Sequence, residues 1–380
     1  MKPIYFDNAA TTKIDEKVLD AMMPFLKEKY GNASSTHLLG EEARRAIEES
    51  REVVAKSIGA KYKEIIFTGS GTEANNMVMK GLFFANRENG KNHIITTKIE
   101  HDCILNACRW LETQGAKVTY LEVDEKGFVD LEQLKNSITP KTIIVSVIHG
   151  NNEIGTIQDL EIIGKICKEK GILFHTDACQ SYTKVKIDVG KMNLDLITLN
   201  AHKIHGPKGI GALYIKEGTK IIPLLHGGGH EFKLRSSTEN VAGIVGFAKA
   251  VKLGMDVKKI RNLRDKLIEG ILKIPNTKLN GVNGDERLCN NVNVSFNNIE
   301  GEAIGSFLNS KGVFSSTGSA CSSHSLESSH VLLALGLTEL QANSSIRLSI
   351  SKYTTEEEVD YVLEELKKIV EKLRKISPIK

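Results

Sequence analysis

The chain has 380 residues, which exceeds the usual size of one compact core, so we expect two structural parts. An apolar content of 41% and a charged content of 26% are typical of a globular protein in water. The net charge of +4 comes from 51 basic and 47 acidic residues that are mixed along the chain. This balance argues against a nucleic-acid binder, which normally carries a basic face or arm.

The sequence opens without a signal-peptide pattern, and no apolar run approaches the length of a membrane span. We therefore expect a cytoplasmic protein that does not bind a membrane. None of the six cysteines belongs to a CxxC pair, so we expect reduced thiols. The spacing of His101, Cys103 and Cys108 matches no zinc template, and we expect no metal in the free protein.

From about residue 40 to residue 255, apolar β-rich segments alternate with helical segments. Most of the predicted strands are apolar on both faces, as in a sheet covered by helices on each side. Helices are predicted over 40–58 and 73–86. The predicted strands are 64–68, 93–97, 118–123, 142–148, 172–177, 194–199 and 211–215. The pattern indicates an α/β domain with a seven-stranded, mostly parallel sheet.

After about residue 256 the pattern changes to a long amphipathic helix over 257–274 and short strands over 290–296 and 344–350. The chain closes with an amphipathic helix, for which Thr354 and Glu357 are a predicted capping box. These elements predict a smaller α+β domain. We expect a large domain over 15–256 and a small domain formed by 1–14 and 257–380.

Polar motifs follow several predicted strands, where ligands bind in open α/β sheets. The segment "TGSGTEANN" (68–76) opens a helix, and its Gly71 and Thr72 suit an anion at the helix N-terminus. An ordinary helix cap explains the same residues equally well. Asp177, in "HTDACQ", follows a buried strand, where a charge needs a partner such as a protonated ring nitrogen. A structural hydrogen bond is the alternative.

Lys203, in "NAHKIHGPKG", also follows a buried strand, and a partly desolvated lysine there can form a Schiff base. His101 and Asn152 lie at two further strand exits, where such residues are often structural. The segment 226–240 is a long polar loop that contains Arg235 and Thr238, and it predicts either a solvated loop or a subunit contact.

The segment "STGSACSSHS" (316–325) places Cys321 among small residues. Free cysteine is usually a small core residue, and this one has no bulky neighbours in sequence to bury it.

Taken together, a Schiff-base lysine, a carboxylate for a pyridine nitrogen and a phosphate site at a helix N-terminus predict pyridoxal phosphate as cofactor. The nucleotide-binding patterns GxGxxG and GxxxxGK[ST] do not occur.

The chain resembles the NifS/IscS branch of the cysteine desulfurases, within the fold-type I pyridoxal phosphate enzymes. The resemblance covers almost the whole chain from about residue 4. It rests on ten motifs in order: "YFDNAATT", "YGNASSTH", "TGSGTEANN", "IEHD", "NNEIGT", "HTDACQ", "AHKIHGPKGIGALY", "RSSTEN", "STGSACSS" and "SSIRLSI".

The resemblance implies a role for each matching residue. Lys203 matches the Schiff-base lysine and base at Cα, and His101 matches the catalytic histidine that is stacked on the cofactor ring and helps to move protons. Asp177 and Gln180 match the partners of the ring nitrogen and ring hydroxyl. Cys321 matches the nucleophile that takes sulfur from L-cysteine as a persulfide and leaves L-alanine.

The remaining matches concern the phosphate group and the substrate carboxylate. The phosphate group is assigned Gly71, Thr72, Asn200 and His202, together with Thr238 from the neighbouring subunit of a homodimer. The substrate carboxylate is assigned Asn152 and Arg347, whose planar fork suits a carboxylate.

Three positions depart from the family pattern: Asn200 replaces a usual Ser, His230 a usual Gln, and Ser237 a usual Gly. The resemblance implies an iron–sulfur scaffold of the IscU/NifU type as sulfur acceptor, and it leaves open whether Cys321 also contacts a nascent cluster. A related lyase that prefers selenocysteine remains an alternative. A non-catalytic platform would lack Lys203 or Cys321, and both are present.

Overall fold

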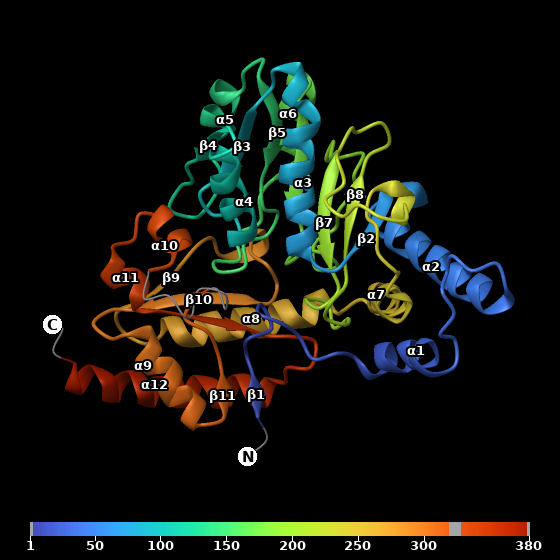
Figure 1. Cartoon of the computed structure of the whole chain (residues 1–380). Helices are drawn as coiled ribbons and strands as arrows, with labels where there is room; N and C mark the ends of the chain where they lie inside the picture. The colour runs from blue at the N-terminus through green and yellow to red at the C-terminus, as the bar shows by residue number, and fades with distance from the viewer. Residues whose placement is uncertain (1–2, 319–327, 378–380) are drawn as a thin grey trace.

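The computed structural model describes residues 3–318 and 328–377, and it is an α/β fold built around one large sheet (Figure 1). The strands of this sheet are β2 (Ile65–Thr68), β3 (His93–Thr97), β4 (Lys117–Leu121), β5 (Thr142–Ser146), β6 (Leu173–Asp177), β7 (Leu196–Asn200) and β8 (Gly211–Ile215). Their order is β2-β8-β7-β6-β5-β3-β4. Strand β8 runs antiparallel to β2 and β7, and all other neighbours are parallel. The predicted seven-stranded, mostly parallel sheet is confirmed.

Helices cover both faces of the large sheet. In this part of the chain they are α1 (Glu16–Lys27), α2 (Leu38–Ser57), α3 (Gly71–Asn86), α4 (Asp102–Glu112), α5 (Leu131–Ser137), α6 (Leu160–Lys170) and α7 (Val241–Leu253). The 3-10 helices are η1 (Tyr62–Glu64), η2 (Arg87–Asn89) and η3 (Glu231–Lys233).

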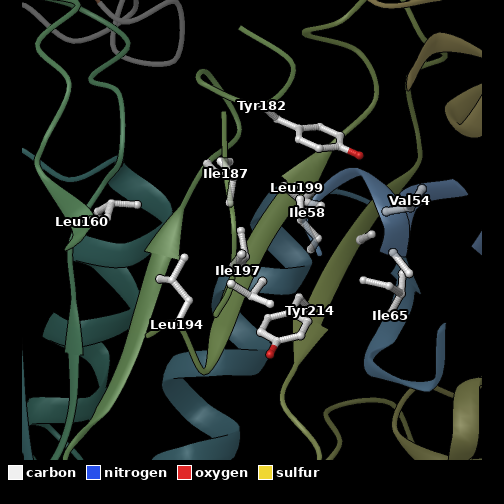
Figure 2. Close-up of a cluster of buried hydrophobic side chains, with 14 of the residues drawn as sticks. Val54, Ile58, Ile65, Leu160, Tyr182, Ile187, Leu194, Ile197, Leu199 and Tyr214 are labelled. Atoms are coloured by element: carbon white, nitrogen blue, oxygen red, sulfur yellow. The ribbon is translucent and has the colours of Figure 1, made fainter. Parts of the chain in front are cut away.

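Successive strand residues point to opposite faces, and in this sheet both faces are apolar. Ile65 and Phe67 belong to a core cluster with side chains from α2, α6 and α7. Ile66, between them, belongs to a second cluster with side chains from α3 and α4. Figure 2 shows part of the first cluster, in which Val54 of α2 lies near the strand residue Ile65. Burial on both faces explains the apolar runs that predicted these strands.

The rest of the chain forms a smaller α+β layer below the large sheet (Figure 1). Its strands are β1 (Ile4–Tyr5), β9 (Thr277–Leu279), β10 (Asn291–Phe296), β11 (Val313–Phe314) and β12 (Ser345–Ser349). Its helices are α8 (Val257–Leu272), α9 (Gly301–Ser310), α10 (His330–Ala334), α11 (Glu339–Asn343) and α12 (Glu356–Ile376), with the 3-10 helix η4 (Gly284–Glu286).

The smaller layer has a hydrophobic core of its own. Strands β12, β10 and β9 form an antiparallel sheet in that order, and β1 pairs in parallel with β11. Ile4 and Phe6 join a cluster whose other buried members all lie between residues 260 and 373. The first residues of the chain therefore pack with its last third. The exact domain limits at residues 14/15 and 256/257 stay a prediction.

The predicted capping box of the last helix is wrong by one residue. Thr355 is the N-cap of α12, and its side chain accepts from the backbone N of Glu358 at 3.2 Å. The Glu358 side chain accepts in turn from the backbone N of Thr355 at 3.1 Å. Thr354 is buried, and its hydroxyl accepts instead from the backbone N of Ser351 at 3.1 Å. Two adjacent threonines, each followed three residues later by Glu, gave the sequence pattern two possible registers.

Across residues 3–318 and 328–377, no helix is long and apolar enough to cross a membrane.

Candidate functional site

Five segments that leave the carboxyl ends of the sheet strands converge with the N-terminal segment 7–12. They follow β2, β3, β5, β6 and β7, and they include the predicted residues Gly71, His101, Asn152, Asp177 and Lys203. The parallel direction of β3, β5, β6 and β7 places these exits at one edge of the sheet. The contacts described below link the five segments.

Asp177 is the last residue of β6 and is only 5% exposed. Its Oδ2 accepts a hydrogen bond from Nδ2 of Asn75 at 2.7 Å, and its Oδ1 accepts from the backbone N of Cys179 at 2.9 Å. Buried carboxylates need such donors, because burial without partners is costly. Asn75 lies in the second turn of α3, so this contact joins α3 to the end of β6.

His101 is the N-cap residue of α4. Its Nδ1 accepts a hydrogen bond from the backbone N of Cys103 at 3.1 Å. The Cys103 Sγ atom also lies 3.1 Å from this Nδ1. The ring therefore occupies a defined position at the start of α4, and it replaces the short polar side chain that usually caps a helix.

Lys203 lies three residues beyond β7 and contacts the N-terminal segment. Its Nζ donates to the carbonyl oxygens of Ala9 and of Ala10, the latter at 2.8 Å. Gln180 is buried, and its Nε2 donates to the same Ala9 carbonyl at 2.8 Å. The predicted lysine and glutamine thus share one backbone acceptor. The exits of β6 and β7 are therefore brought together beneath residues 9 and 10.

The start of α3 can bind an anion. Ser70 is its N-cap, and the side chain of Ser70 accepts from the backbone N of Glu73 at 3.0 Å. Gly71 is buried and packed so closely that a Cβ there would lie 2.6 Å from Sγ of Cys179. Thr72, next to it, is exposed. Glycine is required at this close approach, and the N–H groups of the first turn suit a negatively charged group.

Two further predicted phosphate residues lie at the end of β7 and just after it. Burial lowers the pKa of His202 to about 4, and the nearby Lys203 charge acts in the same direction. His202 is therefore neutral at pH 7, and its Nδ1 lies 3.2 Å from the Thr11 hydroxyl. Asn200 is buried, and its Oδ1 has no hydrogen-bond partner within the described residues. Such a buried polar atom is uncommon and is consistent with a ligand contact.

Arg347 on β12 is fully buried and is paired with Asp7 at 2.9 Å. Its Nη1 donates to the carbonyl oxygen of Asn152 at 3.2 Å. The Nε atom has no partner among the described residues. The predicted substrate pair, Arg347 and Asn152, is therefore in direct contact. Asp7 completes this group, although sequence reasoning did not select it.

Thr238 is exposed, and in this single chain it lines a cavity of about 100 Å³ together with Thr68 and Gly69. Arg235 in the same segment pairs with Glu73 of α3 at 2.8 Å. Ser237 donates through its hydroxyl to the carbonyl oxygen of Thr238 at 3.0 Å. The segment is thus attached to the start of α3 within one chain. A contact of Thr238 with a second subunit stays a prediction.

His230 directly precedes η3, and its Nδ1 is buried without a partner in the described part of the chain.

Cys321 lies outside the described residues, but the residues on either side of its segment contact the site. Ser316 forms a β-bridge with Arg347. On the other side, Ser329 donates to Oε2 of the buried Glu153 at 2.5 Å. The Nε2 atom of His330 lies 3.0 Å from the carbonyl oxygen of Glu100. Ser316, which precedes this segment, is therefore paired with Arg347. The residues after it, Ser329 and His330, contact Glu153 and Glu100, which are the sequence neighbours of Asn152 and His101.

Sequence reasoning missed Asn75, Asp7, Glu100 and Glu153 as parts of the site. Each of them lies inside a quoted motif, and all except Asp7 lie one to three residues from a predicted residue. The sequence feature that could have identified them is a polar side chain close to the end of a predicted buried strand. Their partners are far away in sequence, so the sequence alone did not identify the contacts.

The described cysteines Cys103, Cys108, Cys167, Cys179 and Cys289 are all free. Among residues 3–318 and 328–377, no group of three His, Cys, Asp or Glu side chains is placed to hold a metal ion.

The model of one protein family, aminotransferase class-V, matches residues 4–362. A protein named cysteine desulfurase IscS from Clostridium botulinum is 52% identical, over 100% of this chain and 97% of its own length. A protein of the same name from Methanosarcina thermophila is 51% identical, over 100% of this chain and 94% of its own length.

Two solved structures extend the similarity to the fold. A structure described as a NifS-like protein has a TM-score of 0.91 and 40% identity, and it covers 98% of this chain and 100% of its own. A structure described as SspA in complex with cysteine has a TM-score of 0.84 and 39% identity, over 93% of this chain and 100% of its own.

Proposed function

The chain belongs to the aminotransferase class-V family and, within it, to the NifS/IscS-type cysteine desulfurases, and we propose that it converts L-cysteine to L-alanine. The sulfur atom would remain on Cys321 as a persulfide. The observation that carries the proposal is the convergence of Lys203, Asp177, His101 and the start of α3 with the Arg347–Asn152 pair.

Pyridoxal phosphate fits the residues present at the site. The carboxylate of Asp177 is held by two hydrogen bonds and suits the protonated ring nitrogen. Gly71 opens the helix N-terminus for a phosphate group, and Nδ2 of Asn200 would lie 3.6 Å from a Cβ at Gly71, so the Asn200 amide can donate to a phosphate oxygen there. When bound, this cofactor supplies an electron sink for the bond changes at the substrate Cα.

The residues proposed to hold the cofactor surround these groups. Lys203 would be bonded covalently to it, Gln180 would lie near the ring hydroxyl, and His101 would stack on the ring. Gly71, Thr72, Asn200 and His202 would bind the phosphate, with Thr238 supplied by a second subunit.

Lys203 is also proposed as the group that takes the proton from the substrate Cα. It follows β7 and is partly buried, so its Nζ has few positions to occupy. The backbone carbonyls of Ala9 and Ala10 orient the amine. A fixed amine close to Cα gives general-base catalysis its required geometry.

The substrate carboxylate would bind at Arg347 and Asn152. Arg347 is fully buried, and its charge-assisted hydrogen bonds to a substrate carboxylate would be stronger there than on the protein surface. Asp7 already neutralises part of the arginine charge and holds Nη2. Because Asp7 fixes one end of the guanidinium, the remaining N–H groups keep a defined direction for the incoming carboxylate.

The sulfur step balances without an external oxidant. The Cys321 thiolate forms an S–S bond with the substrate sulfur while the substrate Cβ–S bond breaks. One cysteine and one enzyme thiol give one alanine and one enzyme persulfide. An unperturbed thiol has a pKa of about 8.5, so a base must remove its proton at neutral pH. We propose a nearby lysine for this role, because Nδ1 of His101 already accepts a hydrogen bond from the backbone N of Cys103.

The proposed partners are a second copy of the chain and an iron–sulfur scaffold of the IscU/NifU type. Large apolar side chains on α1, in the segment after it and at the start of α2 support the homodimer. Leu26 is 58% exposed, Tyr30 73% and Leu38 82%. Exposed apolar groups of this size favour a protein contact. A cytoplasmic location stays a prediction, and preference for selenocysteine remains the second candidate activity.

Two variants test the proposal. Cys321→Ser should keep the bound cofactor and lose sulfide release from L-cysteine, because a hydroxyl does not accept the sulfur. Lys203→Ala should lose the visible absorption band of lysine-bound pyridoxal phosphate. Normal sulfide release by Cys321→Ser would reject the assigned nucleophile, and an unchanged band in Lys203→Ala would reject the assigned lysine.

A further inference from the structure

A chain of hydrogen bonds connects Asp177 with His101 through two residues that have no assigned role. The Nδ2 atom of Asn75 lies 2.7 Å from Oδ2 of Asp177 and 3.1 Å from Sγ of Cys103. The Sγ atom of Cys103 lies 3.1 Å from Nδ1 of His101. The two amide hydrogens of Asn75 can therefore serve the carboxylate and the thiol at the same time.

The direction of these bonds can be worked out from the backbone. The N–H of Cys103 can only donate, and it points at Nδ1 of His101 at 3.1 Å. In the neutral ring this contact favours a lone pair on Nδ1 and the ring proton on Nε2. The amide of Asn75 donates to Sγ, so the S–H of Cys103 can donate to Nδ1. Nδ1 has a single lone pair, which the N–H and the S–H share, and both groups disfavour a proton on Nδ1.

The position of His101 strengthens this preference. His101 caps the eleven-residue helix α4, whose N-terminus carries a partial positive charge. A proton on Nδ1 would face the N–H of Cys103 and the positive end of the helix. Protonation at Nδ1 would also break the cap.

We propose that Cys103 is a positioning residue that holds His101 in the Nε2-protonated tautomer and couples it, through Asn75, to Asp177. The inference rests on the proposed function, because it concerns the ring assigned to the cofactor face. Cys103 acts through His101 and would not itself bond to sulfur or substrate. The thiol is required only as a hydrogen-bond donor and acceptor, so the hydroxyl of a serine at this position should serve the same role.

Three substitutions separate this role from packing. Cys103→Ser keeps a donor and an acceptor. Cys103→Ala removes both and reduces the volume, whereas Cys103→Val removes both and enlarges the side chain. Packing alone would make Ser and Ala similar, because both are smaller than the thiol, and Val different from them. Hydrogen bonding predicts that Ser resembles the wild type and that Ala and Val are both impaired.

The first measurement is the nitrogen-15 NMR spectrum of the histidine rings in the cofactor-loaded enzyme, with the His101 signals assigned from a His101→Gln variant. We expect an unprotonated Nδ1 and a protonated Nε2 in the wild type and in Cys103→Ser. A larger share of the Nδ1-protonated tautomer than in the wild type is expected in Cys103→Ala and Cys103→Val, because only the backbone N–H then remains at Nδ1. A wild-type ring protonated at Nδ1, or unchanged His101 signals in the Ala and Val variants, would overturn the proposal.

Kinetics give the second readout. The rate of alanine formation from L-cysteine at saturation should fall about tenfold in the Ala and Val variants, which corresponds to the loss of about one hydrogen bond in the transition state. The KM for cysteine should stay the same, and Cys103→Ser should restore the rate. Equal rates in all four proteins would refute the role of Cys103. If the wild type forms no alanine, the proposed function fails, while the NMR result still decides the tautomer.

Discussion

Glu100 lies directly before His101, and its carboxyl group is fully buried. Its Oε1 accepts from the Thr97 hydroxyl and from the backbone N of Ile148, both at 2.8 Å. Its Oε2 has no partner in the described part of the chain. Burial raises the pKa of Glu100 to about 8, and the Asp177 charge adds to the shift. At neutral pH this residue therefore keeps its proton and places no second negative charge beside Asp177.

This pKa predicts how the free energy of unfolding depends on pH. Below about pH 4.5 Glu100 is protonated in both the folded and the unfolded chain, so it has no effect. Between pH 4.5 and 8 only the unfolded chain loses the proton, so the free energy of unfolding falls as the pH rises. The total loss is on the order of a few kcal/mol, at about 1.4 kcal/mol per pH unit.

Glu100→Gln should remove this loss, because the amide has no proton to lose. In urea unfolding, the variant should be more stable than the wild type at pH 8.5 and similar to it at pH 5. Glu48→Gln, an exposed position on α2, is the control and should behave like the wild type at both values. A Glu100→Gln protein that is less stable at pH 8.5 would show that Glu100 is charged in the folded chain.

For single residues, the sequence was sufficient where the position of the residue in the chain indicates a functional role by itself. Lys203, Asp177 and His101 each follow an apolar strand, and a charge or ring at that place is informative by itself. Asn75 and Asp7 become part of the site only through partners more than a hundred residues away. Cys103 looked like one of several structural thiols until the structure placed it beside His101.

Helices and strands can be predicted from the sequence where one local pattern of residues determines them. All seven strands of the large sheet were predicted, because each is an apolar run between turn residues. The short η3 helix was not predicted, because its three residues Glu231, Phe232 and Lys233 have φ values of 48°, 56° and 68°. Residues other than glycine seldom adopt this left-handed conformation, and they keep it only when the surroundings hold it.

The conformation of η3 is held by a buried ion pair. Arg51 of α2 contacts Glu231 through two hydrogen bonds of 2.6 and 2.8 Å, and both side chains are buried. Glu231 also accepts from the backbone N of Phe67 in β2 at 2.7 Å. The rings of Phe67 and Phe232 lie 4.9 and 5.0 Å from the guanidinium carbon. This cluster connects α2, β2 and the segment that contains Thr238.

Glu231→Ala should therefore reduce the free energy of unfolding by about 3–5 kcal/mol, because it leaves the buried Arg51 charge unpaired. Glu217→Ala is the matched control: its pair with Lys61 at 2.7 Å is more than 70% exposed on both sides. Breaking that solvent-exposed pair should leave the free energy of unfolding nearly unchanged. The measurement is urea unfolding of both variants, and a similar small loss in both would contradict the anchoring role of Glu231.

The whole molecule joins the hydrophobic clusters on the two faces of the large sheet to the cluster of the smaller layer, which contains Ile4 and Phe6. Some contacts between the layers are apolar, as where Ile148 and Ile154 pack with Leu332. Others run through the site itself, as in the Arg347–Asn152 bond and the Lys203 bonds to Ala9 and Ala10. The N-terminal segment belongs to the core of the smaller layer but covers the strand exits of the larger one. Composition and periodicity predicted two parts, and only the tertiary contacts show that the site lies between them.

The central claim concerns the reaction, and one assay tests it most directly. The purified protein is loaded with pyridoxal phosphate, and its visible absorption spectrum is recorded before and after addition of L-cysteine. Alanine and sulfide are measured in the same tube, with dithiothreitol present to release the persulfide sulfur. We predict a visible band that changes on addition, with alanine and sulfide formed in equal amounts. A cofactor-loaded protein that binds cysteine but forms neither product would contradict the account.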